Sequence, residues 1–182
     1  MNILVIHPED TSTNFLTDIY APVAKKKVIR EGVDKYAILK TIPSYDQVMM
    51  MGHGTAFGLL SLRKYISPDR YIVDDAFVHT IKKKKNSLFI WCHANRFVET
   101  YRLKGFYTGM FISEVNEAMY CGLGNIHQEL VDESNTLFST LMADVISEPV
   151  TEIYQYVQAK YGESAEKNAV VAYNHQRLYC AN

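Results

Sequence analysis

Short, nearly continuous runs of apolar residues recur along the chain. Runs of this kind are typical of strands that are buried on both faces of a parallel sheet. They predict six strands, at residues 2–7, 27–30, 47–51, 87–91, 108–113 and 169–173.

Segments with helical spacing of apolar residues lie between these runs. They predict helices at residues 33–39, 75–81, 96–104 and 126–146, and a last helix that begins after Pro149 and ends at Gly162. Asp74 is a suitable N-cap for the second helix. Strands that alternate with helices indicate right-handed βαβ units. We therefore expect an α/β fold with three layers, α/β/α, around a mostly parallel central sheet.

The composition is that of an ordinary globular protein, with 182 residues, 48% hydrophobic and 21% charged. This length suits one domain with its own core, and no repeat, low-complexity tract or linker divides residues 1–182. The net charge of −1 gives no electrostatic reason to expect nucleic acid or an anionic membrane as a partner. The lysine runs at 25–27 and 82–85 are most simply solvated lead-ins to strands.

The sequence also bears on the compartment. The first residues lack the basic start, long apolar core and cleavage site of a secretory signal peptide. No stretch approaches the roughly 20 apolar residues of a membrane-spanning helix. Three cysteines, at positions 92, 121 and 180, are too few and odd in number for a disulfide framework. We expect a cytoplasmic protein.

The chemistry of the chain centres on His53 and Cys92, which follow the ends of consecutive predicted strands. In a doubly wound sheet, ligands bind beyond the carboxyl ends of the strands. Strands that are neighbours lie about 5 Å apart, so both side chains would reach the same edge of the sheet. An unpaired thiol near a histidine is a standard arrangement for acyl transfer. The glycines on either side of His53 leave backbone amides exposed, and that of Gly54 is suited to hold an oxyanion.

A strand that ends in Gly52-His53-Gly54, then a helix, then a strand that ends in Cys92 resembles the caspase–gingipain–legumain group of cysteine peptidases (clan CD). The short polar helix and the apolar strand expected after Cys92 also fit this order, over roughly the first two thirds of the chain. The resemblance implies a caspase-like fold in which the two strands are adjacent. It makes His53 the catalytic histidine, Gly54 the oxyanion glycine and Cys92 the nucleophile of a hydrolase, with a peptide or protein as substrate and no cofactor.

The chain departs from this group at some positions. Trp91 and His93 flank the cysteine, where the family usually has small residues. No acidic residue stands out as the floor of a specificity pocket for basic side chains. Asp74, Asp75 and Glu114 are candidates because they lie near predicted strand ends.

Other polar residues near the same edge are candidates for substrate binding: His93, Asn95, Arg96 and Glu114. His93 is equally explained as an outward-facing residue, and Arg96 as a residue that solvates the following helix. His7 ends the first predicted strand and so falls on the same edge. We predict no metal site, because adjacent Cys92 and His93 rarely both reach one ion and no Cys-x-x-Cys or His-x-x-x-His spacing is present.

Three other interpretations remain open. Free cysteine is among the most buried residue types, so Cys92 alone is well explained as a core residue. The chain is also explained as a non-catalytic caspase-like domain that binds a peptide or protein partner. The third interpretation is a flavodoxin-like domain in which residues 52–55 cradle a phosphate through backbone amides. No complete phosphate-loop pattern supports it, and the Gly-x-Gly at 122–124 does not fit a strand-to-helix turn.

Overall fold

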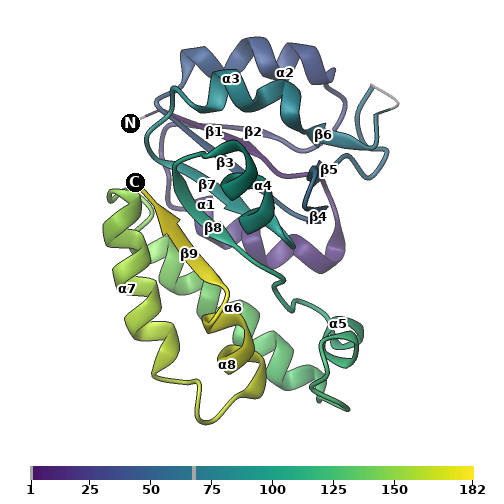
Figure 1. Cartoon of the computed structure of the whole chain (residues 1–182), viewed down its shortest axis with the longest axis vertical. Helices are drawn as coiled ribbons and strands as arrows, with labels where there is room; N and C mark the ends of the chain where they lie inside the picture. Colours follow the sequence, from purple (N-terminus) through teal and green to yellow (C-terminus); the bar gives the residue numbers. More distant parts are fainter. Residues whose placement is uncertain (1, 67–68) are drawn as a thin grey trace.

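The structure is a computed structural model that describes residues 2–66 and 69–182. The described residues form a central sheet of six strands (Figure 1). All neighbours in it are parallel except the last pair. In spatial order the strands are β2 (Lys26–Ile29), β1 (Ile3–Ile6), β3 (Gln47–Met51), β7 (Ser87–Ile90), β8 (Gly105–Thr108) and β9 (Leu178–Ala181).

Helices and short helical turns connect these strands. Before β7 they are η1 (Thr11–Leu16), α1 (Thr17–Tyr20), α2 (Lys35–Thr41), η2 (Ile42–Ser44), η3 (Asp75–Phe77) and α3 (Val78–Ile81). After β7 they are α4 (Ala94–Tyr101), α5 (Val115–Tyr120), α6 (Gln128–Asp144), α7 (Val150–Gly162) and α8 (Ala169–His175). Among the described residues, no helix combines the length and apolar character needed to cross a bilayer.

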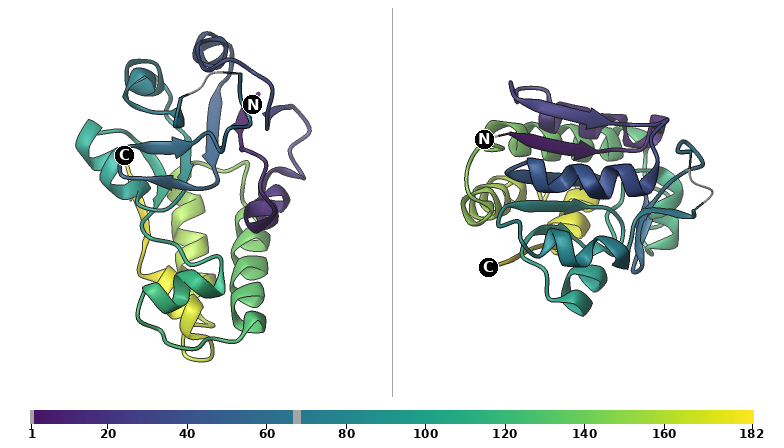
Figure 2. Two further views of the ribbon diagram at one scale, coloured as in Figure 1. Left: turned by 90° about the vertical axis from the view of Figure 1, so that its right-hand side faces the viewer. Right: turned by 90° about the horizontal axis from the view of Figure 1, so that it is seen from above.

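Both faces of the central sheet are covered, as the continuous apolar runs predict. Ile3 and Val5 point to a core built with α1, α6 and α7. Leu4 and Ile6 point to the opposite core, built with α2, α3 and α4. The two further views show the helices on either side of the sheet (Figure 2). The expected three-layer α/β/α fold with a mostly parallel sheet is confirmed.

A small antiparallel sheet follows β3 and was not predicted. It consists of β4 (Gly54–Thr55), β5 (Gly58–Leu60) and β6 (Tyr71–Val73). These strands are too short to give a recognisable pattern in the sequence. The indole Nε1 of Trp91 donates to the carbonyl oxygen of Thr55 at 3.0 Å and so ties this sheet to the end of β7.

Two of the predicted strands are wrong. The run at 169–173 forms helix α8, because the side chain of Asn168 accepts hydrogen bonds from the amides of Val170 and Val171 and caps a helix there. A short apolar run does not distinguish a strand from a buried helix. The predicted strand at 108–113 is displaced, since β8 ends at Thr108 and residues 109–113 form a loop.

The other predicted elements agree with the structure to within a few residues, whereas η1, α1, η2 and α5 were not predicted. Helix α4 begins at Ala94 rather than at 96, and it ends before Arg102, which has a positive φ of 51°. Asp74 caps η3 as predicted, with its carboxylate accepting from the amide of Ala76. Strand β9 was missed, because only Leu178 of its four residues is buried.

Candidate active site

His53 and Cys92 follow neighbouring parallel strands, as expected. The pairing of β3 with β7 ends at Met51 and Ile90, and the amide of Gly52 continues it by donating to the carbonyl of Ile90 at 3.0 Å. His53 and Cys92 each lie two residues beyond this last pair. Both residues line one small cavity of about 20 Å³, which also touches Thr13, Phe15, Leu16, Gly52, Ile90, Trp91, Thr108, Phe111 and Ser113.

The chain turns sharply at Cys92. His93 adopts the left-handed conformation, with φ of 65°, and α4 begins at the next residue. A non-glycine residue in this region is uncommon, and such backbone strain is concentrated at functional sites. The amide of His93 donates to the carbonyl of Gly109 at 3.0 Å, which holds the turn against the end of β8.

The thiol of Cys92 faces two acceptors. Its Sγ lies 3.4 Å from the carbonyl oxygen of Phe111 and 3.9 Å from Oε1 of Glu117, so the thiol donates its proton toward them. Burial of the thiol, and after it the charge of Glu117, raises the pKa of Cys92 to about 12. The thiol is therefore protonated at neutral pH.

Sequence reasoning missed Glu117. The other carboxylate oxygen of this residue, Oε2, accepts from the amide of Ser113 at 2.7 Å, from the hydroxyl of Ser113 at 3.0 Å and from the amide of Glu114 at 3.2 Å. These contacts fix the carboxylate at the start of α5, beside the cysteine. No local motif links Glu117 to Cys92, because the two are 25 residues apart.

His53 contacts Asp10, the N-cap of η1, and Ser12 in η1, and sequence reasoning missed both. Its Nε2 lies 2.7 Å from Oγ of Ser12 and 3.6 Å from Oδ1 of Asp10. The Ser12 hydroxyl in turn donates to Oδ1 of Asp10 at 2.6 Å. The hydrogen bonds from Ser12, together with His53, hold the pKa of Asp10 below its usual value, against the effect of burial. Ser12 therefore bridges the carboxylate of Asp10 and the imidazole of His53.

His7 lies beneath this edge rather than on it. The residue is fully buried, and its two ring nitrogens contact the hydroxyls of Tyr20 at 3.1 Å and Thr13 at 3.2 Å. Burial, followed by the charge of Arg30, lowers the pKa of His7 to about 4. The neutral imidazole thus holds the loop that carries Asp10 and Ser12.

Gly54 does not line the cavity shared by His53 and Cys92. A Cβ at this position would lie 2.1 Å from Cδ1 of Trp91 and 2.8 Å from the carbonyl oxygen of Gly58. Glycine is therefore required for close packing against Trp91. At Gly52, which does line the cavity, the positive φ of 135° requires glycine.

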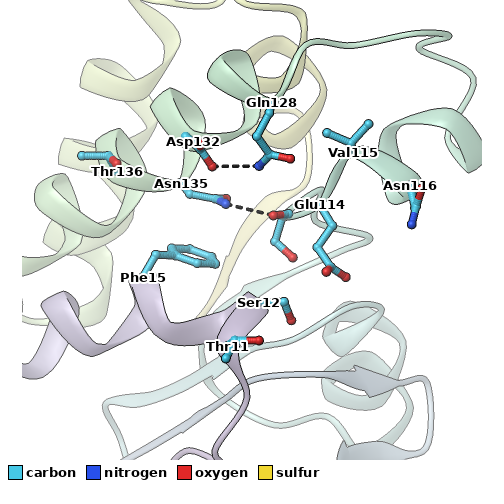
Figure 3. Close-up of a pocket in the computed structure, with 11 residues that line it drawn as sticks. Thr11, Ser12, Phe15, Glu114, Val115, Asn116, Gln128, Asp132, Asn135 and Thr136 are labelled. Atoms are coloured by element: carbon cyan, nitrogen blue, oxygen red, sulfur yellow. Dashed lines mark hydrogen bonds between the residues drawn. The ribbon is translucent and has the colours of Figure 1, made fainter.

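Glu114 lines a larger polar pocket that adjoins the small cavity, with Phe15 and Ser113 common to both (Figure 3). The pocket has a volume of about 440 Å³. The other lining residues are Thr11, Ser12, Val115, Asn116, Gln128, Asp132, Asn135 and Thr136. The pocket therefore lies between the small cavity that His53 and Cys92 line and helix α6.

The remaining candidates lie outside both hollows. His93, Asn95 and Arg96 belong to the turn after β7 and the first turn of α4, and they line neither one. Asp74 forms an ion pair with Lys35 at 2.5 Å, and Asp75 lies beside it in η3. In the part of the chain that the structure describes, no three His, Cys, Asp or Glu side chains are grouped to hold a metal ion.

The phosphate interpretation gains no support from this edge. The strand order β2-β1-β3-β7-β8 is also that of flavodoxin-like sheets. However, Gly54 and Thr55 form β4 and pair with β5, instead of opening a helix whose amides face a ligand.

Comparisons with known proteins identify no family. No family model matches the chain, and no curated protein matches it in sequence. A structural comparison gives the RcsB response regulator of Salmonella typhimurium, with 10% identity and a TM-score of 0.35 over 95% of this chain and 97% of that one. A likeness at this level carries no argument about fold or function.

Proposed function

We propose that the protein is a cysteine-type hydrolase that cleaves peptide bonds, with Cys92 as nucleophile and His53 as general acid. One observation carries the proposal: these two side chains, from adjacent parallel strands, line the same cavity at the carboxyl edge of the sheet. The strained turn at His93, directly after the thiol, adds to it. The resemblance to the caspase–gingipain–legumain group supports the same assignment.

The groups around the thiol suit an acyl transfer. As Sγ of Cys92 attacks the substrate carbonyl carbon, its proton passes to the carboxylate of Glu117, which already accepts from it. The carbonyl oxygen becomes an oxyanion. The amide of Cys92 has no acceptor among the described residues and is free to hold this oxyanion.

Breaking the C–N bond of the peptide requires an acid that protonates the leaving amine. His53, held by Ser12 and Asp10, donates a proton to the nitrogen of the leaving amine as the C–N bond breaks. The product is an acyl-enzyme thioester on Cys92. Water then attacks this thioester and gives one proton to His53, which restores the proton that the imidazole lost. The C–S bond breaks, the carboxylic acid is released, and the proton on Glu117 returns to the thiolate.

Cleavage of a diverse peptide library, read by mass spectrometry, tests this proposal. Wild type, Cys92→Ala and His53→Ala are compared, and we expect cleavage by wild type to be lost in both variants. Removal of a nucleophile lowers the rate by several orders of magnitude. Cleavage that persists unchanged in Cys92→Ala would show that Cys92 is not the nucleophile.

A second candidate function is that of a non-catalytic domain that binds a peptide or protein partner. Two observations favour it: the raised pKa of Cys92, about 12, and a cavity of about 20 Å³ that has room for one water molecule. It predicts that no peptide in the library is cleaved, and that any peptide retained by wild type is retained equally by Cys92→Ala.

The three cysteines of the chain are all unpaired thiols. Free thiols persist in reducing compartments, where disulfides are rare. We accordingly propose the cytoplasm as the place where the protein acts.

A further inference from the structure

The charge of the chain is unevenly distributed along the sequence. Between Lys104 and Lys160 there is no lysine or arginine. The same stretch contains the acidic residues Glu114, Glu117, Glu129, Asp132, Glu133, Asp144, Glu148 and Glu152. It includes α5, α6 and most of α7, which occupy the lower part of the molecule in Figure 1. Although the net charge of the chain is close to zero, the stretch between Lys104 and Lys160 is therefore strongly acidic.

The acidic residues of α6 border two hollows. One is the polar pocket next to the candidate active site. The other, of about 710 Å³, lies between α6 and the segment that leads into α8. Asp132 and Thr136 line both, so they mark the ridge between the two hollows. We call this surface, bounded by Glu114, Glu129, Asp132 and Glu133, the acidic face of α6.

Within this face, the side-chain oxygen of the buried residue Asn135 accepts no hydrogen bond from the described residues. The side chain of Asn135 projects from α6 into the polar pocket, and the residue is only 7% exposed (Figure 3). Its Nδ2 donates to the carbonyl oxygen of Ser113 at 2.9 Å, which fixes the orientation of the amide. Its Oδ1 has no hydrogen-bond partner among the described residues. An unsatisfied buried acceptor is unfavourable until a donor reaches it.

The chemistry of the face therefore points to a ligand rich in donors. Carboxylates and the Asn135 oxygen are acceptors, whereas ammonium and guanidinium groups are donors that accept nothing. No lysine or arginine lines the polar pocket, and Lys167 is at the far hollow. Leu137 and Val171 give that hollow an apolar floor suited to the methylene stems of such side chains.

We propose that the acidic face of α6 binds a lysine- or arginine-rich segment of a partner protein. The segment crosses α6 from the far hollow and enters the polar pocket, where a cationic side chain donates to Glu114, Asp132 and Asn135. This binding site is separate from the reaction at Cys92 and does not depend on it. If the proposed cleavage occurs, the same face delivers basic segments to the catalytic pair.

Fluorescence anisotropy with the full-length Cys92→Ala protein tests the proposal without any cleavage. The probes are two fluorescein-labelled peptides, one of alternating arginine and serine and one of alternating glutamate and serine. We expect the arginine peptide alone to bind, with an affinity that falls as salt is added. Replacement of three acids together, Glu114→Gln, Asp132→Asn and Glu129→Gln, is expected to weaken binding about tenfold.

A matched variant separates a local effect from one of net charge. Glu31→Gln, Asp75→Asn and Glu99→Gln remove the same number of negative charges from exposed positions away from α6. This control is expected to bind the arginine peptide within about twofold of the parent. Failure of the arginine peptide to bind would overturn the proposal, as would equal affinity in all three proteins or equal weakening in both variants. Each result is independent of whether the wild-type protein cleaves peptides.

Discussion

At the scale of single residues, the state of the Cys92 thiol governs what the site can do. Glu117 lies beside it and disfavours the thiolate, so replacing this carboxylate by an amide lowers the pKa of the thiol. We expect Glu117→Gln to make alkylation of Cys92 by iodoacetamide about tenfold faster near pH 8, the effect of one pKa unit. The rate is followed by intact mass in chains that carry Cys121→Ser and Cys180→Ser.

The pH dependence of the alkylation rate also tests whether the pKa of Cys92 is raised. With a pKa of about 12, the rate for Cys92 is expected to keep rising above pH 9, where an ordinary thiol levels off. Glu114→Gln serves as the control, because Glu114 contacts the Glu117 carboxylate through its amide and not the sulfur. An equal acceleration in both variants would mean that the Glu117 carboxylate has no special effect on the thiol.

The sequence singled out His53 and Cys92 as candidates and missed the three residues that contact them. They stood out because Cys92 directly follows an apolar run and His53 is separated from one by Gly52 alone. Asp10 and Ser12 lie at the start of η1, whose position beside the sheet edge depends on tertiary contacts such as the buried contacts of His7. Glu117 reaches the thiol from α5, which follows the loop after β8. Such contacts carry no periodic signal along the chain.

At the scale of secondary-structure elements, Asn174 of α8 determines the position of the loop after β8. Its Oδ1 accepts from the amide of Ile112 at 2.7 Å and its Nδ2 donates to the carbonyl of the same residue at 2.9 Å. We expect Asn174→Ala to lower the free energy of unfolding by about 2–4 kcal/mol, because two buried backbone groups lose their partners. Urea denaturation measures this change.

The same variant is expected to expose the thiol in the native state. The loop held by Asn174 supplies the carbonyl of Phe111, which accepts from Cys92, so its release should accelerate alkylation well below the unfolding transition. Asn168→Ala is the control, since Asn168 is also buried but caps α8 and donates to the carbonyl oxygen of Leu130. Comparable acceleration in both variants would point to global destabilisation instead.

The position of the segment after β1 depends on the contacts of His7, whose imidazole stays neutral at neutral pH. With a pKa of about 4, folded His7 binds no proton between that pH and about 6.5, whereas the unfolded chain does. Acidification through this range therefore favours the unfolded state, and the loss of stability reaches roughly 3 kcal/mol. We expect His7→Gln to flatten the fall in unfolding free energy between pH 7 and pH 4.5.

Urea titrations at several pH values measure this difference. The low pKa of Asp10 adds its own loss at lower pH, but that contribution is present in both proteins and cancels in the comparison. His127→Gln, at an exposed position, is the matched control and should follow the wild-type curve. If His7→Gln followed it as well, His7 would not be the source of the pH dependence.

Element types were predictable where burial was complete on both faces. Strands β1, β3 and β7 are wholly buried, and their apolar runs predicted them with little error. The run at 169–173 is just as apolar, but the cap at Asn168 and the surrounding helices decide in favour of a helix. Strand β9 depends on pairing with β8 and on stacking of Tyr179 against Tyr107, which a local pattern does not contain.

At the scale of the whole molecule, charge is separated although the total is −1. The lysine runs at 25–27 and 82–85 lie in the first 104 residues, and the stretch between Lys104 and Lys160 is purely acidic. Two regions of opposite charge can each bind a charged matrix whatever the net charge, because the matrix interacts with the local charge that faces it. We therefore expect the protein to be retained at neutral pH and low ionic strength by both cation and anion exchangers.

The variant with Glu114→Gln, Asp132→Asn and Glu129→Gln connects this behaviour to the acidic face of α6. It should elute from the anion exchanger at lower salt than wild type, while its elution from the cation exchanger changes far less, since the lysine runs are untouched. A protein whose charge were evenly spread would shift on both columns together. Retention on these columns requires neither a specific peptide nor a reaction, so the result depends on the distribution of charge alone. It therefore tests whether the acidic residues of α6 and its surroundings lie on one surface.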